Sequence, residues 1–125
     1  MNLSKNFSLI EFQSKDGALF PDPVIENLKI LATQLQALRD YLGKPITITS
    51  GYRSKEHNLK IGGALDSYHV RGMAADIQVE GMKPKQVAEA IEVLIKEGKM
   101  MEGGLGIYRT WLHYDHRNKK IRWKK

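Results

Sequence analysis

The strongest constraint on the fold is a long apolar stripe between residues 22 and 43. Apolar residues recur there at alternating steps of four and three, at Val24, Leu28, Leu31, Leu35, Leu38 and Leu42. This spacing places them all on one face of an α-helix, which is typical of a face packed into the core. Asp22 can cap the helix, Pro23 suits its first position, and Gly43 can end it.

The remaining segments mix helix and strand patterns without a regular βαβ alternation. Helix signals are present at residues 8–14, 54–63 and 83–98. Strand signals are present at residues 45–53 and 73–79, and again across 103–123, where strand, turn and strand precede a short last strand at 121–123. This order predicts an α+β fold, with a small antiparallel sheet flanked by helices.

Length and composition limit the class of protein. The 125 residues suit a single domain, and 42% hydrophobic with 27% charged residues is typical of a globular protein. Cysteine is absent, so any transition-metal site must be built from His, Asp and Glu. Much of the net charge of +6 lies in a basic tail at residues 118–125. Such a charge suits a polyanionic partner such as cell-wall polymer or nucleic acid, or it serves solubility alone.

One segment has a histidine and an aspartate at either end of a run of small residues. It reads SYHVRGMAAD at residues 67–76, with His69 and Asp76 seven positions apart. Small residues that can let the chain pass close to an ion lie between them, at Gly72, Ala74 and Ala75. A shared metal ion is one interpretation, and separate hydrogen-bonding or turn roles are the other.

A second segment, WLHYDHR at residues 111–117, can complete such a site. On a strand, His113 and Asp115 would share one face, while His116 would point to the other. Two imidazoles and a carboxylate from the two segments make a plausible three-ligand zinc site, which leaves a fourth position for catalytic water. The alternative for Asp115 is a surface ion pair with Arg117 or a neighbouring lysine.

Three motifs together resemble those of the D-alanyl-D-alanine carboxypeptidase-like metallopeptidases, zinc enzymes that cut peptidoglycan peptides. The pattern S-x-H-x-x-G-x-A-x-D is filled from Ser67 to Asp76, and S-G-Y-R-x-x-x-x-N is filled from Ser50 to Asn58. The late segment GGLGIY…WLHYDHR is similar to the same family in order and spacing. The resemblance covers roughly residues 5–123, and three motifs in order are more specific than any one. It implies the D-Ala-D-Ala metallopeptidase, or hedgehog-like, fold.

The resemblance implies a role for each candidate residue. His69, Asp76 and His113 match the ligands of one zinc ion. Several relatives place a glutamate base three residues before the last histidine, where this chain has Thr110. Asp115 is the nearest substitute, as base or as helper. The opposite assignment, with Asp115 on zinc and His113 as the base, stays open.

Arg53 matches the arginine of the S-G-Y-R motif. The resemblance implies that it holds the substrate's carboxylate or the oxyanion that forms on attack. An internal ion pair to Asp66 or Glu56 is the alternative. Three further residues are candidates to contact and orient the ligands, namely Ser67, His57 and His116.

The implied function is hydrolysis of amide bonds in bacterial peptidoglycan peptides by zinc-activated water, of D,D-carboxypeptidase or endopeptidase type. The alternative is a non-catalytic module with the same fold that binds cell wall or zinc, which the missing glutamate keeps open. Nucleic-acid binding is suggested only by the basic tail, without a recognition helix or a basic–aromatic repeat. We therefore expect peptidoglycan as the partner, no nucleic acid, and a monomer.

The first residues, MNLSKNFSLIEF, lack the apolar stretch of a signal peptide, and no run is long enough to cross a membrane. We expect a protein made in the bacterial cytoplasm that acts at the cell wall without membrane insertion. By analogy, the small build suits a phage or prophage endolysin that reaches the wall through a holin, and a host enzyme is the other possibility.

Overall fold

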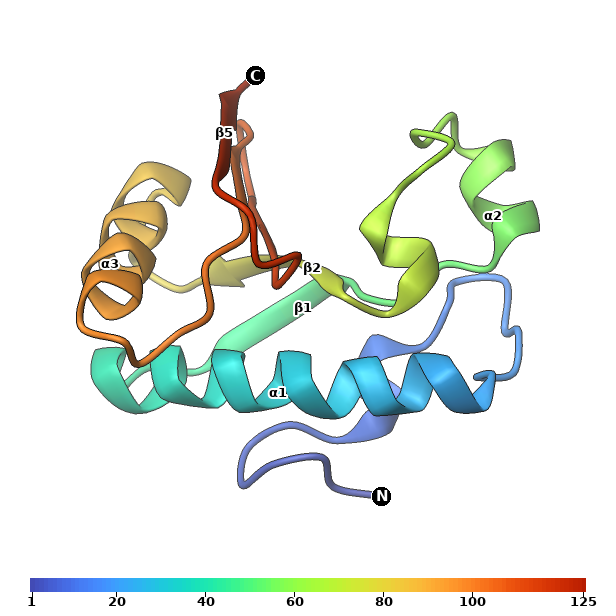
Figure 1. Ribbon diagram of the computed structural model, residues 1–125, viewed down its shortest axis with the longest axis horizontal. Coiled ribbons are helices and arrows are strands. Elements are labelled where there is room, and N and C mark those ends of the chain that lie inside the picture. The colour runs from blue at the N-terminus through green and yellow to red at the C-terminus, as the bar shows by residue number, and fades with distance from the viewer.

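A five-stranded sheet in the order β1-β2-β4-β3-β5 organises the computed structural model, which describes residues 1–125 (Figure 1). The strands are β1 (Ile46–Ser50), β2 (Ala74–Val79), β3 (Gly104–Ile107), β4 (Leu112–Asp115) and β5 (Ile121–Lys124). The helices are α1 (Asp22–Leu42), α2 (Lys55–Lys60) and α3 (Pro84–Lys96), with short 3-10 helices η1 (Leu9–Phe12) and η2 (Tyr68–Arg71). The predicted α+β class is confirmed. None of the helices combines the length and apolarity needed to cross a membrane.

The sheet is mixed, so the expectation of a purely antiparallel sheet is wrong at one edge. Strands pair antiparallel from β1 through β2 and β4 to β3, but β5 pairs parallel with β3. Both edges of β4 are already paired, and the last strand adds to the free edge of β3. Because β4 runs back along β3, a chain that reverses once more arrives parallel to β3. Much of the basic tail at 118–125 is therefore a sheet strand.

Helix α1 lies along one side of the sheet (Figure 1). Its predicted stripe is buried at Val24, Leu28, Leu31, Leu35 and Leu38. The helix begins one residue earlier than expected, because Pro21 takes the N-cap position and Asp22 is already helical. Gly43 ends the helix with φ of 63°, a left-handed conformation that glycine adopts without steric cost.

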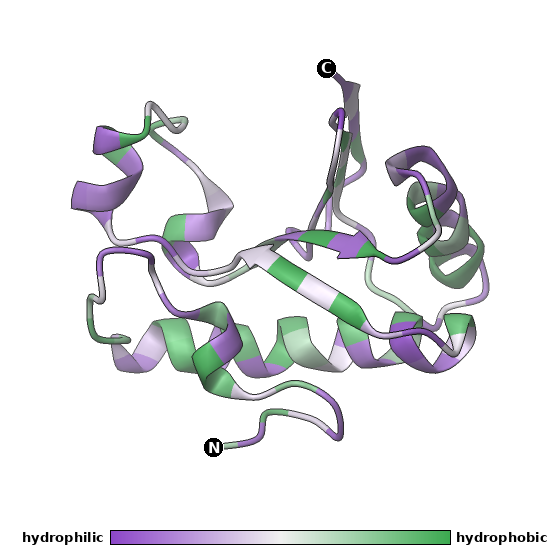
Figure 2. Ribbon diagram, turned by 180° about the vertical axis from the view of Figure 1, so that it is seen from behind, coloured by the Kyte–Doolittle hydropathy of each residue, from purple (hydrophilic) through white to green (hydrophobic).

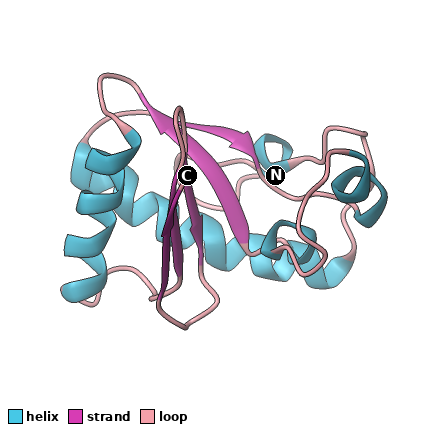
Figure 3. Ribbon diagram, turned by 90° about the horizontal axis from the view of Figure 1, so that it is seen from above, coloured by secondary structure: helices cyan, strands magenta, loops and turns pink.

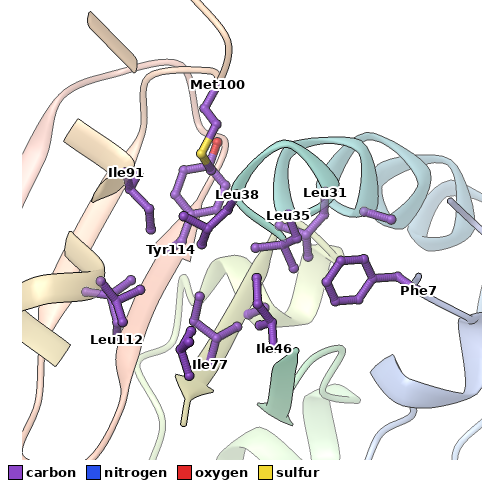
Figure 4. Packing of buried hydrophobic residues seen from close by; sticks show 14 of the residues in the cluster. Phe7, Leu31, Leu35, Leu38, Ile46, Ile77, Ile91, Met100, Leu112 and Tyr114 are labelled. Atoms are coloured by element: carbon purple, nitrogen blue, oxygen red, sulfur yellow. The ribbon is translucent and has the colours of Figure 1, made fainter. Parts of the chain in front are cut away.

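The core fills the space between α1, α3 and one face of the sheet (Figure 4). Hydrophobic and more polar positions alternate along β1 (Figure 2). In β4, Leu112 and Tyr114 are fully buried in this core. Successive side chains of a strand point to opposite faces, so His113 and Asp115 lie on the other face of the sheet. Seen from above, β3, β4 and β5 stand between α3 and the segment that carries η2 (Figure 3).

Candidate metal centre

The three predicted metal ligands come together where β2 and β4 pair. Asp76 of β2 and His113 of β4 are register partners, so their side chains lie side by side on the sheet face away from the core. His69 belongs to η2, which leads directly into β2, and reaches the same point. One ligand atom from each of the three lies within 4.8 Å of the others, and all three residues are buried.

The hydrogen bonds of His69 fix which ring nitrogen faces the centre. Its Nδ1 lies 2.8 Å from the carbonyl oxygen of Gly51, and its Nε2 lies 3.2 Å from Oδ1 of Asp76. A carbonyl oxygen can only accept, so Nδ1 carries the proton of the neutral ring. Burial lowers the pKa of His69, although the hydrogen bond and charge of Asp76 oppose this. The neutral ring therefore presents the lone pair of Nε2 to Asp76.

His113 is arranged in the same way with its nitrogens exchanged. Its Nε2 lies 2.7 Å from Oδ2 of Asp115, and its Nδ1 lies 3.2 Å from Oδ1 of Asp76. The Asp115 carboxylate accepts a hydrogen bond from the Nε2–H group. Nδ1, which faces the centre, is then unprotonated and can coordinate a metal ion. Burial disfavours the charged ring, but hydrogen bonds to Asp115 and Asp76 outweigh it and raise the pKa of His113. The two carboxylates thus favour positive charge at this point.

The donor set fits a bound metal ion. In the neutral tautomers fixed by Gly51 and Asp115, two nitrogen lone pairs face one carboxylate oxygen, an arrangement that a cation between them stabilises. Two ligands bonded at about 2.0 Å to a tetrahedral zinc lie roughly 3.3 Å apart. The two observed separations from Oδ1 of Asp76 are both 3.2 Å. Two imidazoles and one carboxylate are a donor set that catalytic zinc sites use.

Asp76 stays ionised between these partners. Burial alone would raise its pKa, but the rings of His113 and His69, which donate hydrogen bonds to this carboxylate when they are protonated, outweigh burial and hold the pKa well below its usual range. Its second oxygen, Oδ2, accepts from Nη2 of Arg53 at 3.3 Å. One carboxylate therefore serves the metal position with one oxygen and an arginine with the other.

Arg53 is held from three directions at the side of the centre. Its Nη2 contacts Asp76, its Nε donates to Oγ of Ser50 at 3.1 Å, and its Nη1 donates to Oδ1 of Asn58 at 3.4 Å. The S-G-Y-R-x-x-x-x-N motif thus brings its own serine, arginine and asparagine into contact. The alternative ion pair to Asp66 or Glu56 is wrong, because the carboxylate beside Arg53 is that of Asp76.

Asp115 is fully buried and its oxygens are crowded with donors. Oδ1 accepts from the backbone N–H of Gly104 at 3.0 Å and from Nε of Arg117 at 2.8 Å. Oδ2 accepts from Nη2 of Arg117 and from Nε2 of His113, both at 2.7 Å. Burial would raise the pKa of Asp115, but the hydrogen bonds from Arg117 and His113 hold it well below its usual range. The pairing with Arg117, an alternative left open by the sequence, is thus observed together with the contact to His113.

Gly104 makes room for this carboxylate, because a Cβ at that position would overlap Oδ2 of Asp115. We expect Gly104→Ala to cost about 1–3 kcal/mol of unfolding free energy, as overpacking of a rigid site does. Chemical denaturation of the metal-free protein measures this. In an Asp115→Ala background the same substitution should cost clearly less; an equal cost in both backgrounds would contradict the steric explanation.

The three residues considered as helpers of the ligands have different places. Oγ of Ser67 accepts from the backbone N–H of His69 at 3.2 Å, so Ser67 caps η2 and positions that ligand. His57 lies in α2 and contacts none of the three ligands. His116 is buried on the other face of the sheet, with Nε2 3.2 Å from the carbonyl oxygen of Asn27. The prediction that His116 orients a ligand is wrong, because strand alternation turns it toward α1.

The small residues of the first motif serve packing. Gly72 ends η2 with φ of 73°, and a Cβ there would lie 2.8 Å from atoms of Val24 in α1. Ala75 is fully buried in the core. The expectation that Gly72 and Ala75 let the chain pass close to an ion is therefore wrong. They let η2 approach α1, which places His69 over the sheet.

The centre lies in a cavity of about 620 Å³ between η2 with its preceding loop and the β3–β4–β5 part of the sheet. Among the wall residues that sequence reasoning missed is Trp123 of β5. Its indole lies over Gly106, where any Cβ would overlap the ring, and its Nε1 donates to the hydroxyl of Tyr108 at 3.0 Å. The ring centroids of Trp123 and His113 are 5.0 Å apart. The signal for this contact in the sequence was a glycine-rich segment followed by a late tryptophan.

Fold and site define a small α+β protein with a buried centre of two histidines and one aspartate in a cleft. Residues 5–115 match the model of the peptidase M15 family. The chain belongs to this family, as the sequence motifs indicated.

The chain is also similar to individual proteins. The chain is 34% identical over 94 residues to peptidoglycan L,D-endopeptidase MepK of Escherichia coli (strain K12), which covers 68% of this chain and 48% of that protein. It is 44% identical over 52 residues to zinc D-Ala-D-Ala carboxypeptidase of Streptomyces albus G. That match covers 41% of this chain and 20% of the other protein. A crystal structure of Serratia marcescens L-Ala D-Glu endopeptidase ChiX aligns with a TM-score of 0.43 and 23% identity, covering 62% of this chain and 71% of that chain. The chain spans about half the length of the E. coli relative.

Proposed function

We propose that this chain is a zinc-dependent peptidase that hydrolyses amide bonds in bacterial peptidoglycan peptides and acts at the cell wall. The observation that carries the proposal is the convergence of Nε2 of His69, Oδ1 of Asp76 and Nδ1 of His113 within 4.8 Å at the floor of a cleft. Membership of the peptidase M15 family and similarity to the endopeptidase MepK and to the Streptomyces carboxypeptidase support it.

His69, Asp76 and His113 would hold the zinc ion, which supplies Lewis-acid activation of water and of the amide carbonyl when bound. The chain's contribution is to keep these donors fixed before substrate arrives. Gly51 and Asp115 hold the two ring tautomers, and the β2–β4 register holds Asp76 beside His113. A site held in this way needs little reorganisation during the reaction.

Arg53 would bind the substrate beside the centre. It lines the cavity, and Ser50, Asn58 and Asp76 fix the position of its guanidinium. A fixed cation there can hold a substrate carboxylate, or stabilise the negative charge that develops on the carbonyl oxygen.

For Asp115 the contacts favour the helper role over that of general base or zinc ligand. A base must reach the water or the leaving group. The side chain of Asp115 is fully buried and both of its oxygens already accept hydrogen bonds from Arg117 and neighbouring donors. Thr110, at the position of the relatives' glutamate, lies on the exposed turn between β3 and β4. We therefore assign Asp115 to positioning His113, which keeps His113 as the ligand.

The test is mass spectrometry of purified peptidoglycan incubated with the zinc-loaded protein, because the mass of each product names the bond cut. We expect release of peptide or amine that stops when a chelator removes the metal and returns when zinc is restored. Stoichiometric zinc without any product, on walls of several chemical types, would overturn the proposal and favour the alternative, a wall-binding or zinc-binding module.

A further inference from the structure

Arg117 forms part of the cleft wall, and the proposed reaction does not yet use its free donors. The residue follows β4, lines the cavity, and has a side chain that is 19% exposed. We propose that Arg117 is a second carboxylate-binding point of the cleft, separate from Arg53, which selects peptides with a free carboxylate close to the bond that is cut. The inference rests on the proposed peptidase function and specifies its substrate.

The hydrogen bonds of Arg117 leave one edge of its guanidinium free. A guanidinium has five N–H donors, and its geometry matches a carboxylate along more than one edge. Asp115 uses Nε and one N–H of Nη2, at 2.8 and 2.7 Å. Both N–H groups of Nη1 and the second one of Nη2 have no partner in the protein. Together they form a second edge that can bind a carboxylate with two parallel hydrogen bonds.

Aromatic rings and Asp115 hold this guanidinium in place. Its central carbon lies 4.2 Å from the ring centroid of Tyr68 and 5.9 Å from that of Trp123. Tyr68 comes from η2 and Trp123 from β5, so the cation lies between the two walls of the cleft. An arginine fixed in this way loses little rotamer freedom when a ligand binds, which favours affinity.

Arg117 also lies within a few residues' reach of the metal centre. Two hydrogen bonds of 2.7 Å link the ring of His113 through Asp115 to Nη2 of Arg117. A peptide advances by at most about 3.6 Å per residue. A carboxylate on Arg117 therefore belongs to a residue within a few positions of the bond held at the centre. Arg53 contacts Asp76, so the two arginines are linked to different ligands of the cluster.

Charge in the cleft is consistent with an acidic ligand. Arg53, Arg117 and Lys125 line the cavity, and Asp66 is the carboxylate on its wall outside the metal cluster. Stem peptides of peptidoglycan carry free carboxylates, some of which can be converted to carboxamides. Free and amidated forms of one peptide therefore differ in the group that Arg117 would recognise, and the Arg117 variants separate its share of the preference from that of Arg53.

The experiment compares the free-acid and the fully amidated form of one stem peptide, with the zinc-loaded wild type and Arg117→Gln. Both kcat/KM and calorimetric binding are measured. We expect the wild type to prefer the free acid by about 10- to 100-fold, as for a hydrogen-bonded ion pair, and Arg117→Gln to lose most of this preference. Arg117→Lys keeps the charge without the second edge and should keep only a small part of the preference.

The ratio between the two peptides separates recognition from positioning. If Arg117 acts only by supporting Asp115, both peptides lose activity equally and the ratio stays at the wild-type value, which overturns the proposal. A wild type that does not discriminate between the peptides also overturns it. Lys124→Gln, which removes the same charge from the exposed end of β5, should leave the ratio unchanged. Arg117-dependent binding without hydrolysis would support this inference while refuting the peptidase function.

Discussion

Replacing Asp76 by alanine is expected to remove zinc from the protein and to reduce hydrolysis to the level of the metal-free enzyme. Asp76 is the one ligand that contacts both of the others, since its Oδ1 lies 3.2 Å from Nε2 of His69 and from Nδ1 of His113. Without it, two neutral imidazoles remain, and zinc loses the only anionic donor of the site. Zinc per chain after dialysis, measured by atomic absorption, and kcat/KM on the same samples test this.

The structure offers a matched control and a finer variant. Asp66 lines the same cavity but lies outside the ligand cluster, so Asp66→Ala should keep one zinc per chain. Asp76→Asn keeps the shape of the side chain but lacks its charge, and should also lose most of the metal. Retention of stoichiometric zinc by Asp76→Ala would show that the ion is held elsewhere.

Those parts of the site that depend on local periodicity could be predicted from the sequence. Strand alternation alone separates His113 and Asp115 from His116, and the structure places them on the expected faces. The amphipathic stripe of α1 is likewise a local pattern. Both predictions succeed because a strand or helix has a fixed period, whatever lies around it.

The remaining parts depend on contacts between distant segments, which a period cannot reveal. The parallel pairing of β5 follows from which sheet edge is left free, and so does the position of Trp123 over Gly106. The partner of Arg53 could not be predicted because Asp76 is 23 positions away in sequence. Gly72 was misinterpreted because its neighbour, α1, is remote in the sequence.

Asp115→Asn is expected to weaken zinc binding as well as turnover, because Asp115 sets the tautomer of His113. The amide of asparagine has one oxygen and one NH₂ group. Its oxygen is needed at the Oδ1 position, where Gly104 and Arg117 donate. The NH₂ group then faces Nε2 of His113 and donates to it, which transfers the ring proton to Nδ1, the atom that faces the metal. Loss of such a supporting partner typically costs about 10- to 100-fold in metal affinity.

The same substitution should destabilise the metal-free protein. It leaves the buried side of Arg117 without its carboxylate, and breaking a buried ion pair costs about 3 kcal/mol or more. For a chain of this size the melting temperature should fall by roughly 10 °C. Glu102→Gln is the control, because Glu102 pairs with Arg122 at the surface and such pairs contribute at most about 1 kcal/mol.

The combination of readouts distinguishes the three roles that the sequence left open for Asp115. A positioning residue loses zinc affinity, stability and turnover together. A general base would lose turnover while zinc affinity stays at the wild-type value; the melting temperature falls in either case, because the pair with Arg117 is broken. If Asp115 were the ligand and His113 the base, Asp115→Asn would lose the metal and His113→Ala would retain it. Because Asp115 is fully buried and contacts His113 at 2.7 Å, we expect the first pattern.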